Sequence, residues 1–389
     1  MRPESEAAEA RQWSAACARP VAECRPRHDI PAGAEVKPWP GSRPREVSRA
    51  PLATSPEECS TVKLAARRVL VTGAGGFIGA HLVRHLQRLG IEVRAFIHYD
   101  SRPGAGNLDR LADRTGLEVV SGDVRDPHQV RRAVQGCDVV FHLAALISVP
   151  YSYTAPASFV ETNIGGTVHV LEACRDAGVD RVVVTSTSEV YGTATTPRID
   201  ESHPLQAQSP YAASKIGADK LAESYHRAFG LPVSILRPFN NYGPWQSNRA
   251  VIPQVVAQIL SDAPVLRLGA LWPRRDFLYV ADTCRAFTAM AAAPEAIGQT
   301  VHVGTGTAVS IGELAALAME VLGRSKEIVT DDERLRPDDS EVGLLRCDPG
   351  RARRLLGWQA EVDLPTGLVA VAEAMRADGI GAADVGYRV

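Results

Sequence analysis

Short apolar runs separated by amphipathic stretches dominate the chain from Arg67 to about residue 239. The apolar runs have the length and composition of buried strands: Val69–Thr72, Val93–Ile97, Leu117–Val120, Val139–Leu143, Arg181–Thr185 and Val233–Arg237. The stretches between them have helical spacing, notably Phe77–Leu89, Gln129–Val134, Ala157–Ala177 and Tyr211–Phe229. Strands that are apolar at every position, rather than at alternate positions, are typical of a parallel sheet with helices on both faces. The pattern therefore predicts an α/β fold with a doubly wound parallel sheet.

The two ends of the chain have a different texture. Residues 1–66 are rich in Arg, Glu, Pro, Ala and Ser and show no lasting periodicity, so we predict a disordered tail. A dispensable start is the favoured interpretation of this tail, and a partner-binding or targeting segment is the alternative. After residue 239 the alternation breaks up, and we predict a smaller substrate lobe over residues 240–380, with some chain crossing between it and the domain of residues 67–239.

Composition narrows the class of protein. Of the 389 residues 45% are apolar and 23% charged, and the formal net charge is −2, which predicts a soluble protein without affinity for nucleic acid or membrane surfaces. No apolar run reaches the roughly 18 residues of a membrane span, and Met1–Glu4 does not begin a secretory signal. The seven cysteines include no C-x-x-C pair, so we expect free thiols, a cytoplasmic location and no metal site.

A glycine turn connects the first predicted strand to the first predicted helix. Gly73, Gly76 and Gly79 are spaced G-x-x-G-x-x-G, with Phe77 and Ile78 opening the helix. The first glycine allows a tight turn, the second a close approach of the backbone to a pyrophosphate, and the third helix–strand packing. The start of the helix then offers free N–H groups to phosphates. This strand–turn–helix context predicts a Rossmann-type domain that binds NAD or NADP.

The end of the second predicted strand bears on the choice between NAD and NADP. An acidic residue normally accepts the adenosine ribose hydroxyls here, and Asp100 has about the right separation from the glycines. By strand register, however, the acid position falls nearer Ile97. His98 and Arg102 are suited to meet a 2′-phosphate instead. NAD is the predicted cofactor, and the sequence leaves NADP open.

Two further strand ends are candidates for cofactor contacts. Asp123 and Val124 follow the third predicted strand, where a carboxylate can meet the adenine. The alternative for Asp123 is a cap of the helix that follows. Leu143, Ala144 and Ala145 end the fourth predicted strand, and their small size suits a backbone lying against a cofactor.

A tyrosine–lysine pair marks the start of a predicted helix. Tyr211 and Lys215 are four residues apart and therefore share one helix face. A free phenol has a pKa near 10. A neighbouring ammonium and a positive nicotinamide ring both favour the phenolate, which could then remove a hydroxyl proton while hydride leaves the carbon. The pair follows the glycine turn by about 135 residues and the hydroxyl-rich segment Thr185–Gly192 by about 20.

This order of motifs resembles the extended short-chain dehydrogenase/reductase family, in its nucleotide-sugar epimerase/dehydratase branch. The resemblance extends from about Arg67 to Met375 and is strongest to bacterial 4,6-dehydratases of N-acetylhexosamine nucleotides. It rests on four segments: His142–Tyr153, Thr185–Gly192, Ser209–Asp219 and Arg237–Pro244.

The resemblance implies catalytic roles for the residues that match. Thr187 would hydrogen-bond the sugar O4, Tyr211 would be the base in C4 oxidation, and Lys215 would hold the nicotinamide ribose. Glu189 would remove the C5 proton that the C4 ketone acidifies. Ser188 stands where dTDP-glucose 4,6-dehydratases have an aspartic acid that protonates the departing hydroxyl, and a serine cannot replace that acid. We expect Glu189 to transfer both protons, as proposed for GDP-mannose 4,6-dehydratases.

The resemblance also implies a substrate site and a homodimer. Ser148, Asn240, Arg275 and Arg336 match positions that bind the nucleotide sugar. Two guanidinium forks suit a diphosphate, although a single arginine is more often a surface ion-pair partner. Family members often dimerise through helices equivalent to Ala157–Ala177 and Tyr211–Phe229.

The predicted function is a nucleotide-sugar 4,6-dehydratase acting on UDP- or GDP-GlcNAc. A 4-epimerase has no need of a carboxylate at Glu189, so that residue argues against one. The Ser-Thr-Ser-Glu order also resembles UDP-glucuronate decarboxylases, for which Arg274 or Arg275 could bind the substrate carboxylate. A nucleotide-sensing protein without catalysis is the non-enzyme alternative, against which the intact Thr187, Tyr211 and Lys215 argue.

Overall fold

A seven-stranded parallel sheet forms the centre of the computed structural model, which describes residues 64, 66–101, 104–335 and 340–379. The strand order is β11-β6-β5-β4-β1-β2-β3, and every neighbouring pair is parallel. The strands are β1 (Arg68–Thr72), β2 (Glu92–His98), β3 (Leu117–Gly122), β4 (Val139–His142), β5 (Arg181–Thr185), β6 (Val233–Pro238) and β11 (Thr300–Val303). The strand order reverses between β1 and β4, which is where such sheets bind ligands at their carboxyl ends.

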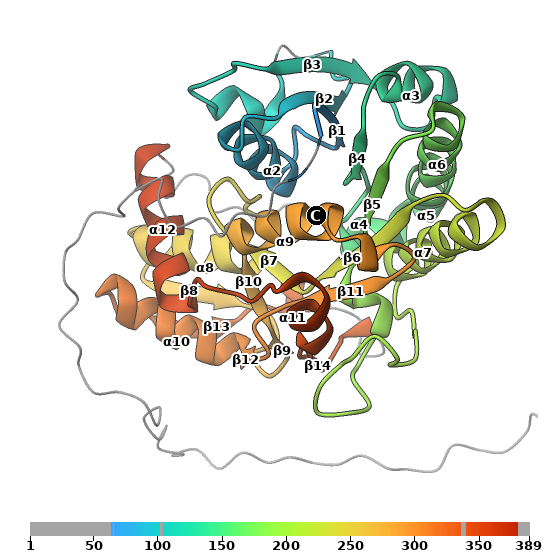
Figure 1. The fold of residues 1–389 in the computed structure, drawn as a ribbon. Coiled ribbons are helices and arrows are strands. Elements are labelled where there is room, and N and C mark those ends of the chain that lie inside the picture. Colours follow the sequence, from blue (N-terminus) through green and yellow to red (C-terminus); the bar gives the residue numbers. More distant parts are fainter. Residues whose placement is uncertain (1–63, 65, 102–103, 336–339, 380–389) are drawn as a thin grey trace, which may run out of the picture. The chain divides into compact units, whose positions relative to one another are not determined.

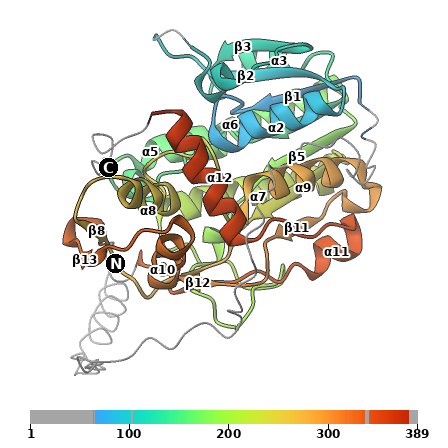
Figure 2. The same cartoon turned by 90° about the vertical axis from the view of Figure 1, so that its left-hand side faces the viewer.

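Helices cover both faces of this sheet. One face packs against α3 (Pro127–Val134), α6 (Gly166–Ala177) and α7 (Pro210–Phe229), as Figure 1 shows. The other packs against α2 (Phe77–Arg88), α9 (Val280–Ala292) and α11 (Gly350–Leu356), and α2 and α9 run side by side in Figure 2. The predicted α/β fold class and its Rossmann-type sheet are therefore confirmed.

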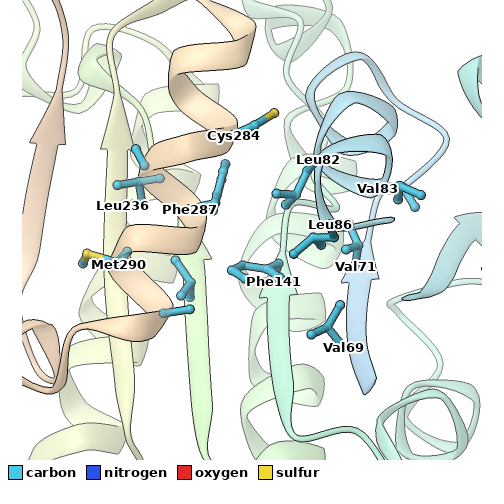
Figure 3. Packing of buried hydrophobic residues seen from close by; sticks show 14 of the residues in the cluster. Val69, Val71, Leu82, Val83, Leu86, Phe141, Leu236, Cys284, Phe287 and Met290 are labelled. Atoms are coloured by element: carbon cyan, nitrogen blue, oxygen red, sulfur yellow. The ribbon is translucent and has the colours of Figure 1, made fainter. Parts of the chain in front are cut away.

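The alternation of side chains along each strand explains why the strands are apolar throughout. Val69 and Val71 of β1 point to the face of α2 and α9, whereas Leu70 between them points to the face of α3 and α6. Figure 3 shows Phe141 of β4 meeting Phe287 of α9, with ring centroids 5.9 Å apart. Side chains on both faces of the sheet are buried, so replacing an apolar strand residue with a polar one would lower the stability of the fold.

A second, smaller core lies in the C-terminal lobe. It is built from α8 (Val251–Leu260), α10 (Ile311–Leu322) and α12 (Leu364–Ala377). Short strand pairs surround these helices: β7 (Asn240–Tyr242) with β10 (Phe277–Tyr279), β8 (Val265–Leu268) with β13 (Glu327–Thr330), and β9 (Arg274–Arg275) with β12 (Val309–Ser310) and β14 (Leu344–Leu345). Between these elements the chain returns to the main sheet as α9 and β11, so that sheet draws on residues from both sides of position 239.

The segment after β7 joins the lobe to the first helix of the sheet domain. His81 of α2 donates from Nε2 to the carbonyl of Pro244 at 2.9 Å, and its ring stacks on Trp245 with centroids 4.5 Å apart. Trp245 adopts φ of 67°, and it is the single non-glycine residue with positive φ in the described part of the chain. Such a conformation persists only where its surroundings enforce it.

Most predicted elements differ from the observed ones by one or two residues at an end, and one predicted helix is divided. The helix predicted over Ala157–Ala177 is divided into α5 (Pro156–Phe159), a π-helical turn η2 (Val160–Gly165) and α6. The π turn aims the buried Asn163 at the backbone of Leu146 and at Ser214 Oγ, which ties the loop after β4 to α7. The fourth strand ends at His142, one residue before the predicted end.

Other sequence predictions concern composition or lie outside the described residues. The predicted tail is in this second group, apart from Leu64 and Ala66. Cys137, Cys174, Cys284 and Cys347 are buried free thiols. Among the described residues no helix is long and apolar enough to cross a bilayer.

Candidate active site

The glycine turn after β1 has the geometry of a phosphate cradle. Gly73 has φ of +69°, and a Cβ there would lie 2.8 Å from the backbone nitrogen of Ala144. A Cβ on Gly79 would lie 2.3 Å from the carbonyl oxygen of Gly73, so this glycine lets α2 pack on the turn. Gly76 is exposed and is the N-cap of α2, without a side-chain cap bond and without an acidic residue in the first turn. The helix therefore begins with N–H groups that an anion can meet.

At the end of β2, the residue beside this turn is Ile97 and not the expected acidic residue. Ile97 is buried with its Cγ2 next to Gly75, which agrees with the register argument made from the sequence. His98 and Asp100 lie beyond it on the exposed strand end. His98 Nδ1 is 4.0 Å from Asp123 Oδ2. Arg102, the other predicted partner of a 2′-phosphate, lies outside the described residues.

The structure corrects one interpretation of Asp123. The cap of α3 is Asp126, whose carboxylate accepts from the backbone N–H groups of His128 and Gln129. Asp123 instead forms a bidentate ion pair with Arg125, which lowers the pKa of its carboxyl group. The helix-cap alternative is therefore wrong, because the cap needs the residue directly before the first turn.

Val124 is almost completely buried. Its side chain packs against Gly166 at the start of α6, and its carbonyl accepts from His169 Nδ1 at 2.9 Å. A cofactor contact at this position would thus use a small exposed part of the residue, since Val124 is 6% exposed.

The loop after β4 lies directly against the glycine turn. The backbone nitrogens of Leu143 and Ala144 both donate to Thr72 Oγ1, at 3.1 and 3.2 Å. Leu143, Ala144 and Ala145 are half-buried, as suits a backbone wall. Ser148 follows as the N-cap of α4 (Val149–Thr154), where its hydroxyl accepts from Tyr151 N at 3.3 Å.

The tyrosine–lysine pair lies in the first turns of α7, as predicted from its spacing. Tyr211 is 8% exposed, and burial raises the pKa of its phenol, whereas a hydrogen bond from Thr187 lowers it. Lys215 is 5% exposed and donates from Nζ to the carbonyl of Thr185 at 2.6 Å. Burial lowers the pKa of Lys215 and the nearby Asp219 carboxylate raises it. The helix thus presents both side chains to the end of β5.

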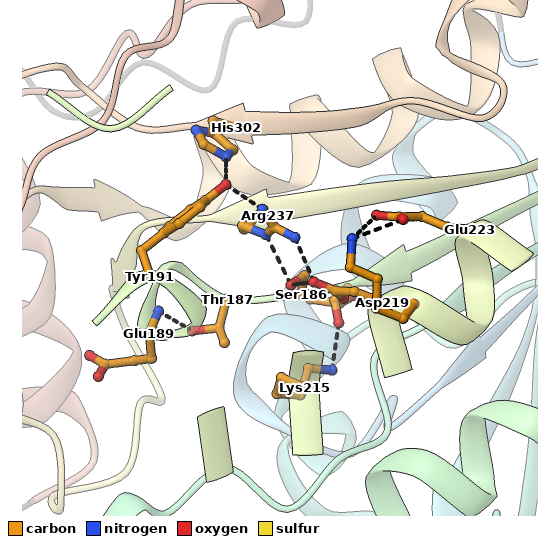
Figure 4. A network of polar contacts seen from close by, with 11 residues as sticks. Ser186, Thr187, Glu189, Tyr191, Lys215, Asp219, Glu223, Arg237 and His302 are labelled. Carbon is orange, nitrogen blue, oxygen red and sulfur yellow. Dashed lines mark hydrogen bonds and ion pairs between the residues drawn. The ribbon is translucent and has the colours of Figure 1, made fainter. Parts of the chain in front are cut away.

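The segment between β5 and Gly192 carries the other three predicted catalytic residues. Thr187 precedes the short helix η3 (Ser188–Tyr191), and its Oγ1 accepts from Glu189 N at 3.2 Å. Figure 4 shows the Glu189 carboxylate directed away from the buried polar contacts behind it. Ser188 between them is 2% exposed. Thr187 and Glu189 are half-buried, so they are the members of this segment that a ligand can reach.

The predicted diphosphate residues come from different parts of the lobe. Asn240 lies at the start of β7, and its Oδ1 is buried without a hydrogen-bond partner among the described residues. Arg275 on β9 is 6% exposed, donates to the carbonyl of Val342 at 2.6 Å, and pairs with Glu341 at 3.1 Å. A diphosphate at Arg275 would therefore meet a guanidinium that already has a carboxylate neighbour. Arg336 lies outside the described residues.

Sequence reasoning missed a buried polar network directly behind this segment. Figure 4 shows Ser186, Tyr191, Asp219, Arg237 and His302 in contact with one another. Two signals were available. Asp219 follows Lys215 by four residues and therefore shares its helix face, and Arg237 is a charged residue in an otherwise apolar strand.

Comparison with known proteins agrees with this geometry. The family described as GDP-mannose 4,6 dehydratase matches residues 70–370. The low-salt glycan biosynthesis protein Agl12 of Haloferax volcanii is 33% identical over 305 residues, which cover 78% of this chain and 96% of that protein.

Solved structures show the same likeness. DesIV, a dTDP-glucose 4,6-dehydratase from Streptomyces venezuelae solved with NAD and TYD, is 34% identical with a TM-score of 0.73, over 82% of this chain and 99% of that one. A UDP-glucuronic acid 4-epimerase from Bacillus cereus, solved with UDP-glucuronic acid and NAD, is 29% identical with a TM-score of 0.73, over 80% and 99%. The chain thus belongs to the GDP-mannose 4,6-dehydratase family, within the extended short-chain dehydrogenases that act on nucleotide sugars.

Proposed function

We propose that this protein is an NAD-dependent nucleotide-sugar 4,6-dehydratase. The observation that carries the proposal is the placement of Thr187, Glu189 and Tyr211: the Thr187 hydroxyl bonds the Tyr211 phenol, and Glu189 follows two residues later on the same short segment. Oxidation at C4 and proton removal at C5 need a base and a carboxylate beside adjacent carbons of one sugar ring. The similarity to DesIV supports the same reaction class.

The cofactor fits the residues present at the carboxyl edge of β1 and β4. The uncapped start of α2 and the open face of Gly76 suit a pyrophosphate, and Leu143–Ala145 form a wall beside them. A nicotinamide bound at this edge would supply hydride transfer, away from C4 of the sugar and back to C6. The NAD in the DesIV and Bacillus cereus structures supports NAD over NADP.

Tyr211 is the base for the oxidation. Its phenolate takes the proton of the C4 hydroxyl, and Thr187 holds both the Tyr211 oxygen and the sugar O4. The ammonium of Lys215, one turn further along α7, holds the nicotinamide ribose and favours the phenolate. Burial raises the pKa of Tyr211, and the carboxylates of Glu189 and Asp219 raise it further, so the positive charges of Lys215 and of the bound nicotinamide are needed to favour the phenolate.

Glu189 carries the elimination. Once C4 is a ketone, its carboxylate removes the C5 proton, and the same group, now a carboxylic acid, protonates the departing C6 hydroxyl. Ser188 lies buried next to it and has no carboxyl proton to offer. One carboxyl group thus performs both transfers. The enolate formed when hydride returns to C6 takes a proton at C5, which balances the proton that Tyr211 removed from the C4 hydroxyl.

The substrate is inferred to be a UDP- or GDP-linked N-acetylhexosamine. This inference is supported by the segments His142–Tyr153 and Arg237–Pro244, which resemble enzymes of that class. Asn240, Arg275 and Arg336 are assigned to the diphosphate and Ser148 to the sugar.

The protein is inferred to form a homodimer through the helices from residue 156 to 177 and α7. The exposed side chains of Val160 and Phe229, at 53% and 54%, support this interface.

Incubation with UDP-GlcNAc, GDP-GlcNAc, dTDP-glucose and UDP-glucuronate, followed by mass spectrometry, tests the function. We expect loss of one water from an N-acetylhexosamine nucleotide without added reductant. Loss of carbon dioxide from UDP-glucuronate would show a decarboxylase, and a changed sugar of unchanged mass would show an epimerase. Either of these in place of dehydration overturns the proposal.

The variant Glu189→Gln separates the two halves of the reaction. We expect dehydration to fall by at least about 100-fold, the size of a lost general base, while reduced nicotinamide still forms upon C4 oxidation. Absorbance of the reduced nicotinamide in a single turnover measures the first half, and mass spectrometry the second. Glu118→Gln, the same change on β3 away from the site, should leave both unaltered. Normal dehydration by Glu189→Gln would remove Glu189 from the mechanism.

A further inference from the structure

One guanidinium group touches both ends of the catalytic segment. Arg237 on β6 donates from Nε to Ser186 Oγ at 3.2 Å, at the residue before Thr187. Its Nη1 donates to the hydroxyl of Tyr191, two residues after Glu189. Figure 4 shows this guanidinium lying directly behind the segment. Thr187 and Glu189 therefore lie between two side-chain contacts made by one residue.

The same guanidinium also binds the catalytic helix. Its Nη2 donates to Asp219 Oδ2 at 2.6 Å, and Ser186 Oγ donates to the same oxygen at 2.6 Å. Asp219 follows Tyr211 and Lys215 at four-residue intervals, so all three project from one face of α7. Through Asp219, the position of the segment from Ser186 to Tyr191 is fixed relative to Tyr211.

The network is buried and its hydrogen bonds have one consistent direction. Asp219 is 0% exposed, Arg237 3% and Tyr191 0%. A guanidinium can only donate, so the Tyr191 hydroxyl accepts from it and donates its own proton to His302 Nε2, 2.5 Å away. His302 then donates from Nδ1 to the carbonyl of Ile199. Burial lowers the pKa of His302, in keeping with the neutral ring that this order requires.

The charges around Asp219 add to this constraint. Its carboxylate stands between the guanidinium of Arg237 and the ammonium of Lys215, both buried. A lysine in place of Arg237 would keep the charge, but its single nitrogen cannot serve Ser186, Tyr191 and Asp219 in one plane as the planar fork does. The requirement is thus for the shape of arginine as well as for its charge.

The geometry assigns Arg237, held by Asp219, the role of a positioning residue that sets Thr187 and Glu189 in place against Tyr211. The assignment rests on the proposed function for the roles of those three residues. The two ends of the segment then differ in what they control. The Ser186 contact adjoins Thr187 and so governs C4 oxidation, whereas the Tyr191 contact adjoins Glu189 and so governs elimination.

The test removes one contact at a time and follows the two steps in a single turnover with the full-length protein, NAD and a nucleotide sugar. The rise of reduced-nicotinamide absorbance reports oxidation, and its decay reports elimination with hydride return. We expect Ser186→Ala to slow the rise by about tenfold with little change in decay, the effect of one lost hydrogen bond. Tyr191→Phe should slow the decay by about tenfold and leave the rise nearly unchanged.

Arg237→Lys should slow both steps, and the double variant Ser186→Ala/Tyr191→Phe should reproduce that pattern. Two matched controls remove buried or half-buried hydroxyls elsewhere. The first is Ser234→Ala, on β6 like Arg237, where the serine hydroxyl bonds the carbonyl of Ala296. The second is Tyr225→Phe, on α7 like Asp219, where the tyrosine hydroxyl bonds Glu172. We expect both controls to keep wild-type rates for both steps when their thermal stability equals that of Ser186→Ala and Tyr191→Phe.

The outcomes separate this inference from the proposed function. If the wild type dehydrates a nucleotide sugar and Ser186→Ala and Tyr191→Phe slow the same step, or neither step, the positioning role is overturned while the function stands. If the wild type reduces NAD with a nucleotide sugar but yields no dehydrated product, the proposed function fails. The Ser186→Ala arm still decides the inference in that case, because C4 oxidation remains measurable.

Discussion

The proposed cofactor side and the proposed sugar side of the site are built in different ways. On the cofactor side, the turn from Gly73 to Gly79 offers backbone groups at spacings fixed within one short stretch of chain. On the sugar side, the assigned groups are side chains from separate elements, with Asn240 on β7 and Arg275 on β9. Arg275 has its own acidic neighbour, Glu341, from a third segment.

This difference determines which substitutions would impair binding on each side of the site. Backbone contacts tolerate most changes of side chain but not an atom that blocks access to the backbone. The cofactor side therefore depends on which atoms an added Cβ would contact. Side-chain contacts depend on the packing of distant segments, so the sugar side depends on partners such as Glu341. Three predictions would break or sharpen this comparison.

The largest effect is expected at the glycine turn, from Gly79→Ala against Gly76→Ala. A Cβ on Gly79 would meet the backbone of Gly73 and Ala74 at 2.3 and 2.8 Å, so we expect a loss of about 3 kcal/mol of stability. A Cβ on Gly76 meets only Gly73 O, at 3.1 Å, and φ of −74° there suits any residue. This second variant should fold normally but bind NAD weakly.

Chemical denaturation and NAD titration distinguish the two variants. If Gly76→Ala binds NAD as tightly as the wild type, the backbone around this glycine does not approach the pyrophosphate. If Gly79→Ala is as stable as the wild type, the packing of α2 on the turn is looser than the contacts indicate.

A smaller and more selective effect is expected from Arg275→Lys. The lysine keeps a charge but loses the planar fork, so we expect UDP affinity to fall by about tenfold, with NAD affinity unchanged. Calorimetric titration with each ligand measures both. The neighbouring Arg274→Lys is the matched control, because Arg274 is exposed and pairs with Glu313 at 3.1 Å. Equal losses in both variants would place the diphosphate elsewhere.

The smallest effect is expected outside the site, from His85→Gln on α2. Burial lowers the pKa of His85 to about 4, with Arg285 and Arg88 adding to the shift, and His85 Nε2 contacts Thr288 Oγ1 at 3.3 Å. Between that value and the ordinary pKa of about 6.5, the unfolded chain holds a proton here that the folded chain does not. Stability from this group is therefore present above about pH 6.5 and is lost as the pH falls towards 4.

Denaturant unfolding at several pH values measures this effect. We expect the stability of His85→Gln to depend on pH less steeply than that of the wild type in this interval, by about one proton. Parallel curves for the two proteins would show that His85 titrates alike in both states. No change in NAD or UDP affinity is expected, since His85 lies away from both proposed binding regions.

The sequence determined much of the fold and the local parts of the site. Continuous apolar strands required two covered faces, and the spacing of Gly73, Gly76 and Gly79 and of Tyr211 and Lys215 reflects contacts within a few residues. Such contacts follow from helix and turn geometry alone.

Only the tertiary structure decided how distant segments combine. It returned β11 to the main sheet and gave Arg275 its neighbour Glu341. It also joined Ser186, Tyr191 and Asp219 through Arg237. These contacts link residues up to 66 positions apart, and no local spacing records them, because the partner of a buried charge depends on which elements pack around it.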